Sequence, residues 1–490
     1  MRFAIGRTFA VGCFAVLASA CHPEVLLSGD SSEAGTDAEQ GMPLPIPPFD
    51  ASYLCATSGQ CTCTVDNQCI QNCPTGSPTS ISGTVYDPAG NNPLYDIAVY
   101  VPASLPLPTL PGPPTALVSC PHCADYYPKV VAGDLTDTKG QFKFTHVPVG
   151  SNIPLVVQIG KWRHLTHVTI VACQDNPMTD KTLLLPGQAG PDDTLPEIAI
   201  STGGADSLEC LLERIGVAES EYTNGAGGNG RIHVFQGGGG NSVPGPAMRN
   251  GSPSSPTALW PSASELRKYD VAILSCEGGE TSGANPTALA EYADVGGRIF
   301  ASHYHYAWFT APNGPFFRDN LASWHPNTQD IGDINAFIET GFFGGKQMHD
   351  WLANVGALTN DELHIVQARH NADVSASNKP SRAWITADQS AGSPAGTAAG
   401  ATEYFSFDTP VGSRVEQMCG RVVYSDLHVG AASLDYGIQA GGNTTGGIVP
   451  TGCAKMPLSP QEKALEYMLF DLAACWTPAD VPPSTNNWPK

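Results

Sequence analysis

Two short apolar runs separated by a helical segment constrain the fold of this chain more than any other feature. The runs are Val271–Leu274 and Ile299–Ala301, and neither alternates with polar residues. Unbroken runs of this length, with a helix between them, are typical of strands buried on both faces of a parallel sheet. Because ligands of open α/β sheets collect beyond the carboxyl ends of the strands, we expect any functional site at that edge.

Side chains capable of acid–base chemistry, nucleophilic attack or metal binding follow the apolar runs directly. A third run, Val422–Tyr424, ends in the same way. The side chains that follow the three runs are Cys276, Glu277, His303, His305, Asp426 and His428. If the runs are neighbouring parallel strands, these candidate catalytic residues converge at one edge of the sheet.

Cys276 is the candidate nucleophile. Ser275 precedes it and Gly278 follows two positions later, which matches half of the motif that exposes a nucleophile between a strand and a helix. A nucleophilic thiol needs a base within reach and a lowered pKa. Because Leu274 stands where the motif has its first glycine, the sequence favours the alternative, a structural cysteine that is buried or disulfide-bonded.

The histidines are the candidate metal ligands. His303 and His305 share one face if their segment is extended, and His428 follows a different strand. The carboxylates that could complete a zinc site with an open position are Glu277, Glu280 and Asp426. Alternatively, Asp426 orients a ligating imidazole. The competing interpretation is that neutral histidines pack at the sheet end, so we predict no cofactor and keep zinc as the rival hypothesis.

Four aromatic side chains near these histidines offer a surface for a sugar ring. They are Tyr304, Trp308, Phe309 and Trp324. Aromatic rings bury large apolar areas, which suits the apolar face of a saccharide. Core packing under a long loop explains the same residues equally well, so the sequence leaves both interpretations open.

The first twenty residues have the pattern of an export signal. Two arginines precede an apolar segment, Phe9–Ala20, that is too short to span a bilayer. The segment ends in LASA followed by Cys21, which resembles the lipobox of bacterial lipoproteins. The resemblance implies that residues 1–20 are removed and that Cys21 carries acyl chains, with His22 favouring the outer membrane. An ordinary cleavable signal is the alternative.

Residues 21–54 and 55–78 have the compositions of a tether and of a cysteine-rich segment. The tether is acidic and rich in Ser, Gly and Pro, which is typical of disordered linkers. The second segment lacks the paired CxxC units of zinc sites, so its cysteines predict a disulfide knot: Cys55, Cys61, Cys63, Cys69 and Cys73. With Cys13 and Cys21 removed from the 15 cysteines, an odd number remains, so at least one thiol has no partner within the chain.

Residues 79–200 carry the alternation and turns of a small β-sandwich. Ile81–Tyr86 alternates, and Asp87–Gly90 has the composition of a turn. The segments SGTVYDPAGNNPLYDIAVYVP and TDTKGQFKFTHVPVG resemble the carboxypeptidase regulatory-like domain, a transthyretin-like sandwich. The resemblance implies a structural or ligand-presenting module. Cys120 and Cys123 lie in a proline-rich loop, which favours a disulfide over a redox site.

Residues 205–475 alternate predicted strands and helices. Leu208–Ile215 has one apolar face and is followed by Gly216, and Ser459 begins a helix with a capping box. Strands that alternate with helices predict a mostly parallel sheet with right-handed crossovers. We therefore expect an α/β domain after the sandwich and a short tail at 476–490.

Four short motifs in the α/β region resemble the trehalose-utilisation (ThuA-like) family. They are YDVAIL, GGRIFASHYH, DEL and GRVVYSDLH. That family has the class I glutamine amidotransferase-like, flavodoxin-like fold, so the resemblance implies this fold and a ligand crevice that includes His303. The amidotransferase nucleophile is replaced here by Ser302-His303, and His428 lacks the glutamate of the His-x-Glu pair. The resemblance extends to exported bacterial proteins that join the same two domains.

Charge limits the partners of the chain. A formal net charge of −22 excludes non-specific nucleic-acid binding, which needs a basic footprint. No Lys or Arg lies between Arg7 and Lys129, so attachment to a membrane has to come from a lipid anchor. We therefore expect a cell-surface lipoprotein with a binding or structural role, its candidate ligand being a saccharide at the α/β crevice. The alternative is a metal- or histidine-assisted hydrolase or sugar-modifying enzyme in the same crevice.

Overall fold

The apolar runs form neighbouring parallel strands in the computed structural model. β13 (Val271–Leu274) pairs in parallel with β14 (Arg298–Ser302), and β14 pairs in parallel with β22 (Gly420–Ser425). Every residue of the three strands is buried, which explains why their apolar residues do not alternate with polar ones. The three runs therefore end side by side.

The structure describes residues 70–71, 73, 77–112, 126–179, 181–238, 247–248, 253–312, 314–318, 320–326, 330–387, 401–428 and 457–483. These residues belong to one compact unit, Met42–Lys490. The predicted signal, the lipidation site Cys21, the tether, most of the cysteine-rich segment, Cys120 and Cys123 lie outside the described residues. Among those described, no helix has the length and apolar character needed to cross a membrane.

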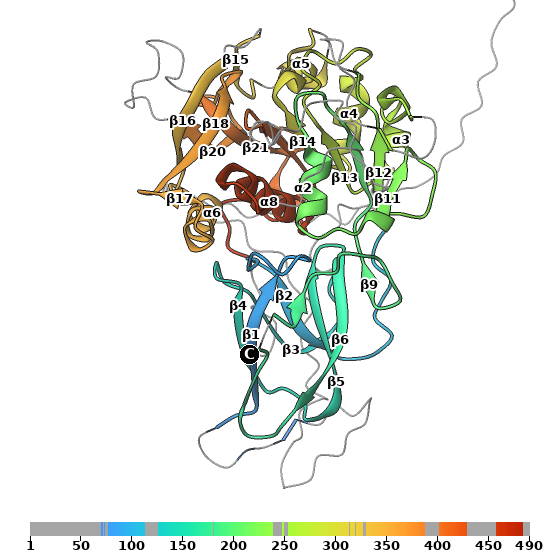
Figure 1. Ribbon diagram of the computed structural model, residues 1–490, viewed down its shortest axis with the longest axis vertical. Helices are drawn as coiled ribbons and strands as arrows, with labels where there is room; N and C mark the ends of the chain where they lie inside the picture. Colours follow the sequence, from blue (N-terminus) through green and yellow to red (C-terminus); the bar gives the residue numbers. More distant parts are fainter. Residues whose placement is uncertain are drawn as a thin grey trace, which may run out of the picture. The chain divides into compact units, whose positions relative to one another are not determined.

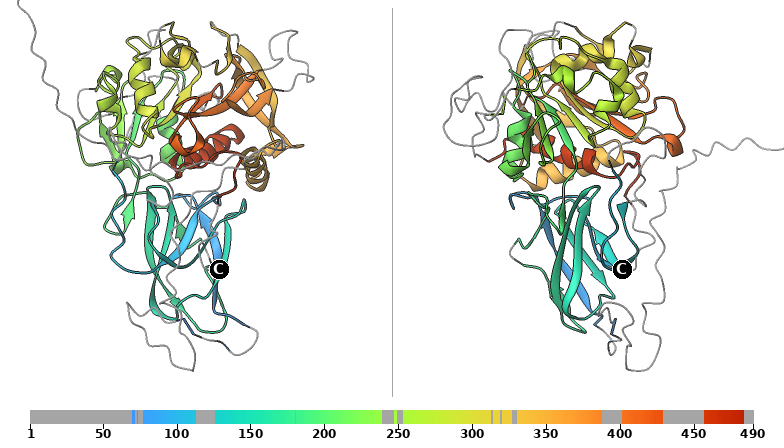
Figure 2. Two further views of the ribbon diagram at one scale, coloured as in Figure 1. Left: turned by 180° about the vertical axis from the view of Figure 1, so that it is seen from behind. Right: turned by 90° about the vertical axis from the view of Figure 1, so that its right-hand side faces the viewer.

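Two sheets near the start of the described chain form a β-sandwich (Figures 1 and 2). One has the order β4–β1–β7 with β8 also on β1, and the other has the order β3–β2–β5–β6–β9. Inward side chains of both sheets, such as Ile81, Phe144 and Val157, belong to one core. The strands are β1 (Ser80–Tyr86), β2 (Ala98–Pro102), β3 (Val130–Leu135), β4 (Gln141–Thr145), β5 (Gly150–Ile159), β6 (Trp162–Ile170), β7 (Asp175–Pro177), β8 (Leu183–Leu184) and β9 (Asp193–Thr194).

A mixed sheet of eleven described strands makes up most of the remaining chain. Its order is β11–β12–β10–β13–β14–β22–β21–β20–β16–β18–β17. Pairings from β11 to β22 are parallel, and pairings from β22 to β17 are antiparallel. The other strands are β10 (Ile198–Ser201), β11 (Tyr222–Asn224), β12 (Ile232–Phe235), β16 (Asp330–Ile338), β17 (Leu358–Thr359), β18 (Glu362–Arg369), β20 (Arg382–Ala387) and β21 (Thr402–Thr409).

The prediction of a mostly parallel sheet is wrong for the second half of this sheet. β18 alternates buried and more exposed residues along much of its length, as expected for a strand with one face toward solvent. Its neighbour β16 runs antiparallel to it, from Ala336↔Leu363 to Asp330↔Arg369. The described chain is accordingly rich in strands, and its parallel and antiparallel halves meet at β22.

The expected boundary between the sandwich and the following domain is also corrected. β10 falls inside the predicted range 79–200, yet it pairs with β12 and β13 in the large sheet. Both pairings are parallel, and all four of its residues are buried. The large sheet therefore begins at Ile198 and not near residue 205.

The helices are short, and α8 begins with the signal seen in the sequence. Ser459 accepts a hydrogen bond from the backbone N–H of Glu462, whose carboxylate accepts one from the Ser459 N–H, so the capping box at the start of α8 is confirmed. The helices are α2 (Leu208–Arg214), α3 (Ala263–Leu266), α4 (Pro286–Ala293), α5 (Tyr306–Thr310), α6 (Phe343–Asn354) and α8 (Pro460–Ala473). Among the described residues, short 3₁₀ turns add η4 (His303–His305) and four others.

α8 contacts both the sandwich and the large sheet. The Phe470 ring lies 5.2 Å from the Trp162 ring of β6, measured between centroids. The Asn92 amide, on the turn after β1, donates a 2.7 Å hydrogen bond to the Glu466 carboxylate. The two β-rich parts therefore share a packed and hydrogen-bonded junction.

The cysteines confirm a disulfide but not a knot confined to residues 55–78. Cys73 is bonded to Cys173, 100 positions away, beyond the end of β6. The backbone contact between Ser80 and Gln174 places these two segments together, so Cys73 fastens the cysteine-rich segment to the sandwich. Cys210, Cys419 and Cys475 are also disulfide-bonded, and Cys276 is the free cysteine of the described chain.

Candidate functional site

Three of the predicted site residues meet beyond the ends of the parallel strands. The Cys276 Sγ lies 3.2 Å from the His303 Nδ1, and the His428 Nε2 lies 3.1 Å from that same nitrogen. All three donor atoms lie within 4.8 Å of one another, and all three residues are buried. We refer to Cys276, His303 and His428 as the strand-end cluster.

Strand register brings these residues together. Leu274, Ala301 and Tyr424 are aligned across β13, β14 and β22, so the chain leaves all three strands at nearly the same level. His303 then takes a φ of +45°, which is uncommon for a residue with a side chain. This left-handed conformation ends β14 abruptly and begins the turn η4. Backbone conformations of this kind concentrate at functional sites.

The Cys276 thiol is held neutral by its surroundings. Burial raises the pKa of Cys276 to about 12, and the nearby Asp206 acts in the same direction. Backbone N–H groups of Gly278 and Tyr304 donate to the sulfur and lower the pKa by a smaller amount. A buried thiol with a raised pKa is a poor nucleophile, so the geometry favours the structural alternative for the free thiol.

The histidine at the centre of the cluster is also neutral. Burial lowers the pKa of His303 well below its ordinary value, and His428 and Arg369 lower it further. Its Nε2 atom is buried and has no hydrogen-bond partner in the described part of the chain. Neutral imidazoles and a sulfur atom at this spacing are potential ligands for a metal ion.

Two predicted candidates lie outside the strand-end cluster. The expectation that His303 and His305 share a face is wrong, because η4 is a 3₁₀ turn and not an extended segment. The His305 Nδ1 donates to the Ser302 carbonyl at 2.9 Å, and burial lowers the pKa of His305 to about 4. Glu280 accepts a 2.6 Å hydrogen bond from the Tyr306 hydroxyl. These two residues support the fold around the cluster.

The remaining predicted carboxyls are buried and border the cluster. Burial raises the pKa of Glu277, which follows Cys276 in the chain, to about 7. Burial likewise raises the pKa of Asp426 to about 7, against the lowering effect of hydrogen bonds from the Asn371 N–H and the Tyr424 hydroxyl. The Tyr424 hydroxyl also lies 2.7 Å from the His303 carbonyl oxygen, which links Asp426 to the cluster.

The structure adds polar residues that sequence reasoning missed. Asp206, after β10, accepts a 2.7 Å hydrogen bond from Ser302, the residue before His303. An apolar run followed by polar residues marks the end of β10 too, so the rule applied to the other strands could have found Asp206. Arg369 on β18 lowers the pKa of His303 and of Asp426, and Glu403 on β21 interacts electrostatically with Asp426. Both residues lie on antiparallel strands, for which that rule gives no signal.

The aromatic candidates divide between core and site. Trp308 and Phe309 are fully buried in the core, which favours the core interpretation for both. Trp324 is half-buried and stacks on Phe309 with centroids 5.6 Å apart. Tyr304 stays partly exposed and packs against His303, with ring centroids 4.2 Å apart. Tyr304 is therefore the aromatic side chain that both borders the cluster and keeps some accessible surface.

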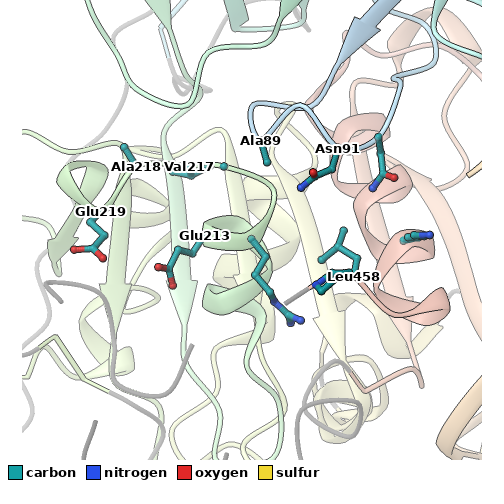
Figure 3. Close-up of a pocket in the computed structure, with 12 residues that line it drawn as sticks. Ala89, Asn91, Glu213, Val217, Ala218, Glu219 and Leu458 are labelled. Carbon is teal, nitrogen blue, oxygen red and sulfur yellow. The ribbon is translucent and has the colours of Figure 1, made fainter. Parts of the chain in front are cut away.

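A cavity of about 630 Å³ lies elsewhere, at the junction of the sandwich with α2 and α8. Figure 3 shows Ala89 and Asn91 on the sandwich turn and Glu213 on α2 around this cavity. Several of its polar side chains already have internal partners: the Arg214 guanidinium pairs with Glu462, and the Lys463 ammonium donates to the Val355 carbonyl. The strand-end cluster is therefore the better candidate for a functional site.

Comparisons with known proteins add little to this description. No family model and no curated protein match the chain. A crystal structure of an N-terminal interface mutant of the type II cohesin–X-dockerin complex from Acetivibrio cellulolyticus matches with a TM-score of 0.16 and 11% identity. That match covers 28% of this chain and 85% of the other. A likeness at this TM-score carries no argument about fold or function.

Proposed function

We propose that the chain is an exported, lipid-anchored protein of the cell surface whose ligand-binding centre is a zinc ion held by the strand-end cluster. The observation that carries the proposal is the convergence of one thiol and two imidazoles, with donor atoms within 4.8 Å, from the ends of three strands. Sulfur and imidazole nitrogen are the donors that zinc prefers. Three protein ligands leave a fourth position for an external ligand, which zinc would polarise as a Lewis acid.

The separations of two of the three donor pairs fit such an ion. Donors around a tetrahedral zinc, with bonds of about 2.0–2.3 Å, stand roughly 3.3–3.6 Å apart. The separations of 3.2 Å (Cys276–His303) and 3.1 Å (His303–His428) need to open by only a few tenths of an ångström. The N–H groups of Gly278 and Tyr304 that point at the Cys276 sulfur are the kind of hydrogen bonds that stabilise a metal-bound thiolate.

Strand order supports the proposed flavodoxin-like, ThuA-like architecture of the parallel half. Without the short edge strand β11, the order β12–β10–β13–β14–β22 corresponds to 2-1-3-4-5 when these five strands are numbered along the chain. In folds with this order, ligands bind where the strand order reverses, between the first and third strands. Those strands are β10 and β13, which lead to Asp206 and Cys276. The cluster thus lies beside the position at which such sheets bind ligands.

A saccharide is the ligand class that we propose for this centre. Tyr304 offers a partly exposed ring directly beside His303, and aromatic rings pack against the apolar faces of sugars. Sugar hydroxyls are oxygen donors of the kind that can occupy the open position on zinc. The Tyr304→Ala variant should bind its saccharide more weakly while retaining the metal, as measured by glycan-array binding together with metal analysis.

Metal analysis of the purified full-length chain tests the centre itself. We expect about one equivalent of zinc to be lost in Cys276→Ser, His303→Ala and His428→Ala, because each variant removes one ligand. His364→Ala is the matched control, since His364 is an exposed histidine on β18. Equal zinc content in the wild type and all three ligand variants would contradict the proposal. If the wild type instead contains copper that the ligand variants lose, the metal is copper and not zinc.

A hydrolase is the second candidate function. Two buried carboxyls, Asp426 and Glu403, lie within electrostatic reach of each other beside the cluster, and hydrolases often place carboxyls beside a reacting centre. A metal-loaded chain assayed on chromogenic esters and glycosides would show turnover that falls at least about a hundredfold in Asp426→Asn. If the wild type binds a ligand but shows no turnover, the hydrolase function is contradicted and the binding function remains.

A further inference from the structure

We infer that the chain carries a second metal site, beside a small two-stranded sheet outside the strand-end cluster, which takes a divalent first-row transition metal ion. Its ligands are His325, His370 and Asp373, here called the two-strand cluster. One nitrogen from each histidine and one oxygen of the aspartate lie within 4.8 Å of one another. The inference does not depend on the proposed function, because none of these residues belongs to the strand-end cluster.

The two-stranded sheet holds the three side chains of this cluster in place. β15 (Ser323–Trp324) pairs antiparallel with β19 (Ala372–Asp373), and Ser323 lies opposite Asp373. Beyond the paired strands, the His325 N–H donates to the Asn371 carbonyl, and the Asn371 amide donates back to the His325 carbonyl. The buried Asn371 N–H also donates to the Asp426 carboxylate at 2.7 Å. The backbone that carries the ligands is therefore fixed to the interior.

Both imidazoles point their Nε2 atoms at one carboxylate. The His370 Nε2 lies 2.6 Å from the Asp373 Oδ1, and the His325 Nε2 lies 2.7 Å from the Oδ2. Adjacent ligands of an octahedral ion, with bonds of about 2.1 Å, stand roughly 3.0 Å apart. The two nitrogen–oxygen separations therefore need to open by about 0.3–0.4 Å to admit an ion between the imidazoles and the carboxylate.

The chemistry of the set indicates the class of ion. Two imidazoles and one carboxylate on one side of a metal are typical of iron(II), zinc and related divalent ions, and they leave positions for water or a ligand. His325 keeps 47% of its side chain exposed and Asp373 keeps 31%, so an ion can enter from solvent. His370, at 12%, supplies the inner ligand. Sulfur is missing from this set, which distinguishes it from the strand-end cluster.

Titration of the metal-free full-length chain with cobalt(II) tests the inference. A thiolate ligand gives a sulfur-to-cobalt charge-transfer band, whereas a histidine and carboxylate site gives only the weaker d–d bands. Beside the cobalt ion held at the strand-end cluster, we expect the wild type to bind a second cobalt ion that adds nothing to the thiolate band, and we expect Asp373→Asn and His325→Ala to weaken the binding of this second ion by more than about tenfold. His364→Ala, which changes another exposed histidine, should bind as the wild type does.

The same titration separates this inference from the proposed function. Cys276→Ser should remove the thiolate band and leave the two-strand cluster intact. If the wild type shows no thiolate band but Asp373→Asn still loses one ion, the proposed function fails and the two-strand cluster stands as a metal site. If Asp373→Asn, His325→Ala and the wild type bind the same number of cobalt ions with the same affinity, the two-strand cluster is overturned as a metal site.

Discussion

At the scale of single residues, Glu209 shows how burial controls the ionisation of a carboxyl near Asp206. It lies in the first turn of α2 and is fully buried. Burial raises its pKa from 4.5 to about 8, Asp206 adds to the rise, and its own backbone N–H opposes it. The folded chain therefore holds a neutral carboxyl at a pH where the unfolded chain has an ionised one.

The Glu209→Gln variant should change the pH dependence of stability. Between pH 4.5 and about 8 the folded state binds more protons at Glu209 than the unfolded state, so the free energy of unfolding falls as the pH rises. Glutamine does not titrate and so removes this dependence. At pH 8 the variant should therefore be more stable than the wild type by an amount on the order of 4 kcal/mol, and at pH 4 it should have no such advantage. Urea denaturation across this range measures the difference.

A matched control separates this effect from a general effect of charge. Glu291 is an exposed glutamate on α4, so Glu291→Gln should shift stability equally little at both pH values. A Glu209→Gln variant that follows the wild type at every pH would show that Glu209 is ionised in the folded chain.

The candidate site was predictable in part, for a physical reason visible in individual residues. Cys276, His303 and His428 meet because parallel strands end at one edge, a rule that needs only the positions of apolar runs. His305 was misplaced because the left-handed φ of His303 starts a 3₁₀ turn, which spacing does not reveal. The cysteine knot was misjudged at Cys73 because pairing depends on distant backbone contacts.

At the scale of elements, the sequence predicted the features that depend on residues close together in the chain. The capping box of α8 and the buried runs of β13, β14 and β22 were correct because each depends on neighbouring residues. Strand partners are not local. The antiparallel half was missed because alternation along β18 indicates a strand without indicating which strand lies beside it. The two-strand cluster was missed for the same reason, since β15 and β19 are far apart in sequence.

The capping box of α8 makes a prediction at this scale. α8 packs against β18 and β14 and also contacts the sandwich, so fraying of its first turn should loosen several contacts. Ser459→Ala removes the side chain that accepts from the Glu462 N–H, and it should lower the free energy of unfolding by about 1 kcal/mol. Ser459→Asp should retain most of the stability, because aspartate is an equally good cap. Equal stability of all three chains in urea would contradict the role of the cap.

At the scale of the whole molecule, the described chain joins two β-rich parts through α8. Trp162 is fully buried, donates its indole N–H to the Pro186 carbonyl at 2.6 Å and packs on Phe470. The Trp351 indole donates to the Pro93 carbonyl, also at 2.6 Å, so the large-sheet part is hydrogen-bonded to the sandwich turn as well. Parts that share buried aromatic side chains lose those contacts when either part unfolds, which couples their unfolding.

Calorimetry of two tryptophan variants tests this coupling. The wild type should show one transition in which the calorimetric and van't Hoff enthalpies agree. Trp162→Ala, at the junction, should shift that whole transition downward, at a cost of about 3–5 kcal/mol, because the lost ring leaves a cavity in contact with both parts. Trp384→Ala is the matched control: Trp384 is also buried, but it packs on Phe342 within the large-sheet part. If the two parts unfold independently, the wild type will give two transitions, and Trp384→Ala will move one of them and leave the other unchanged.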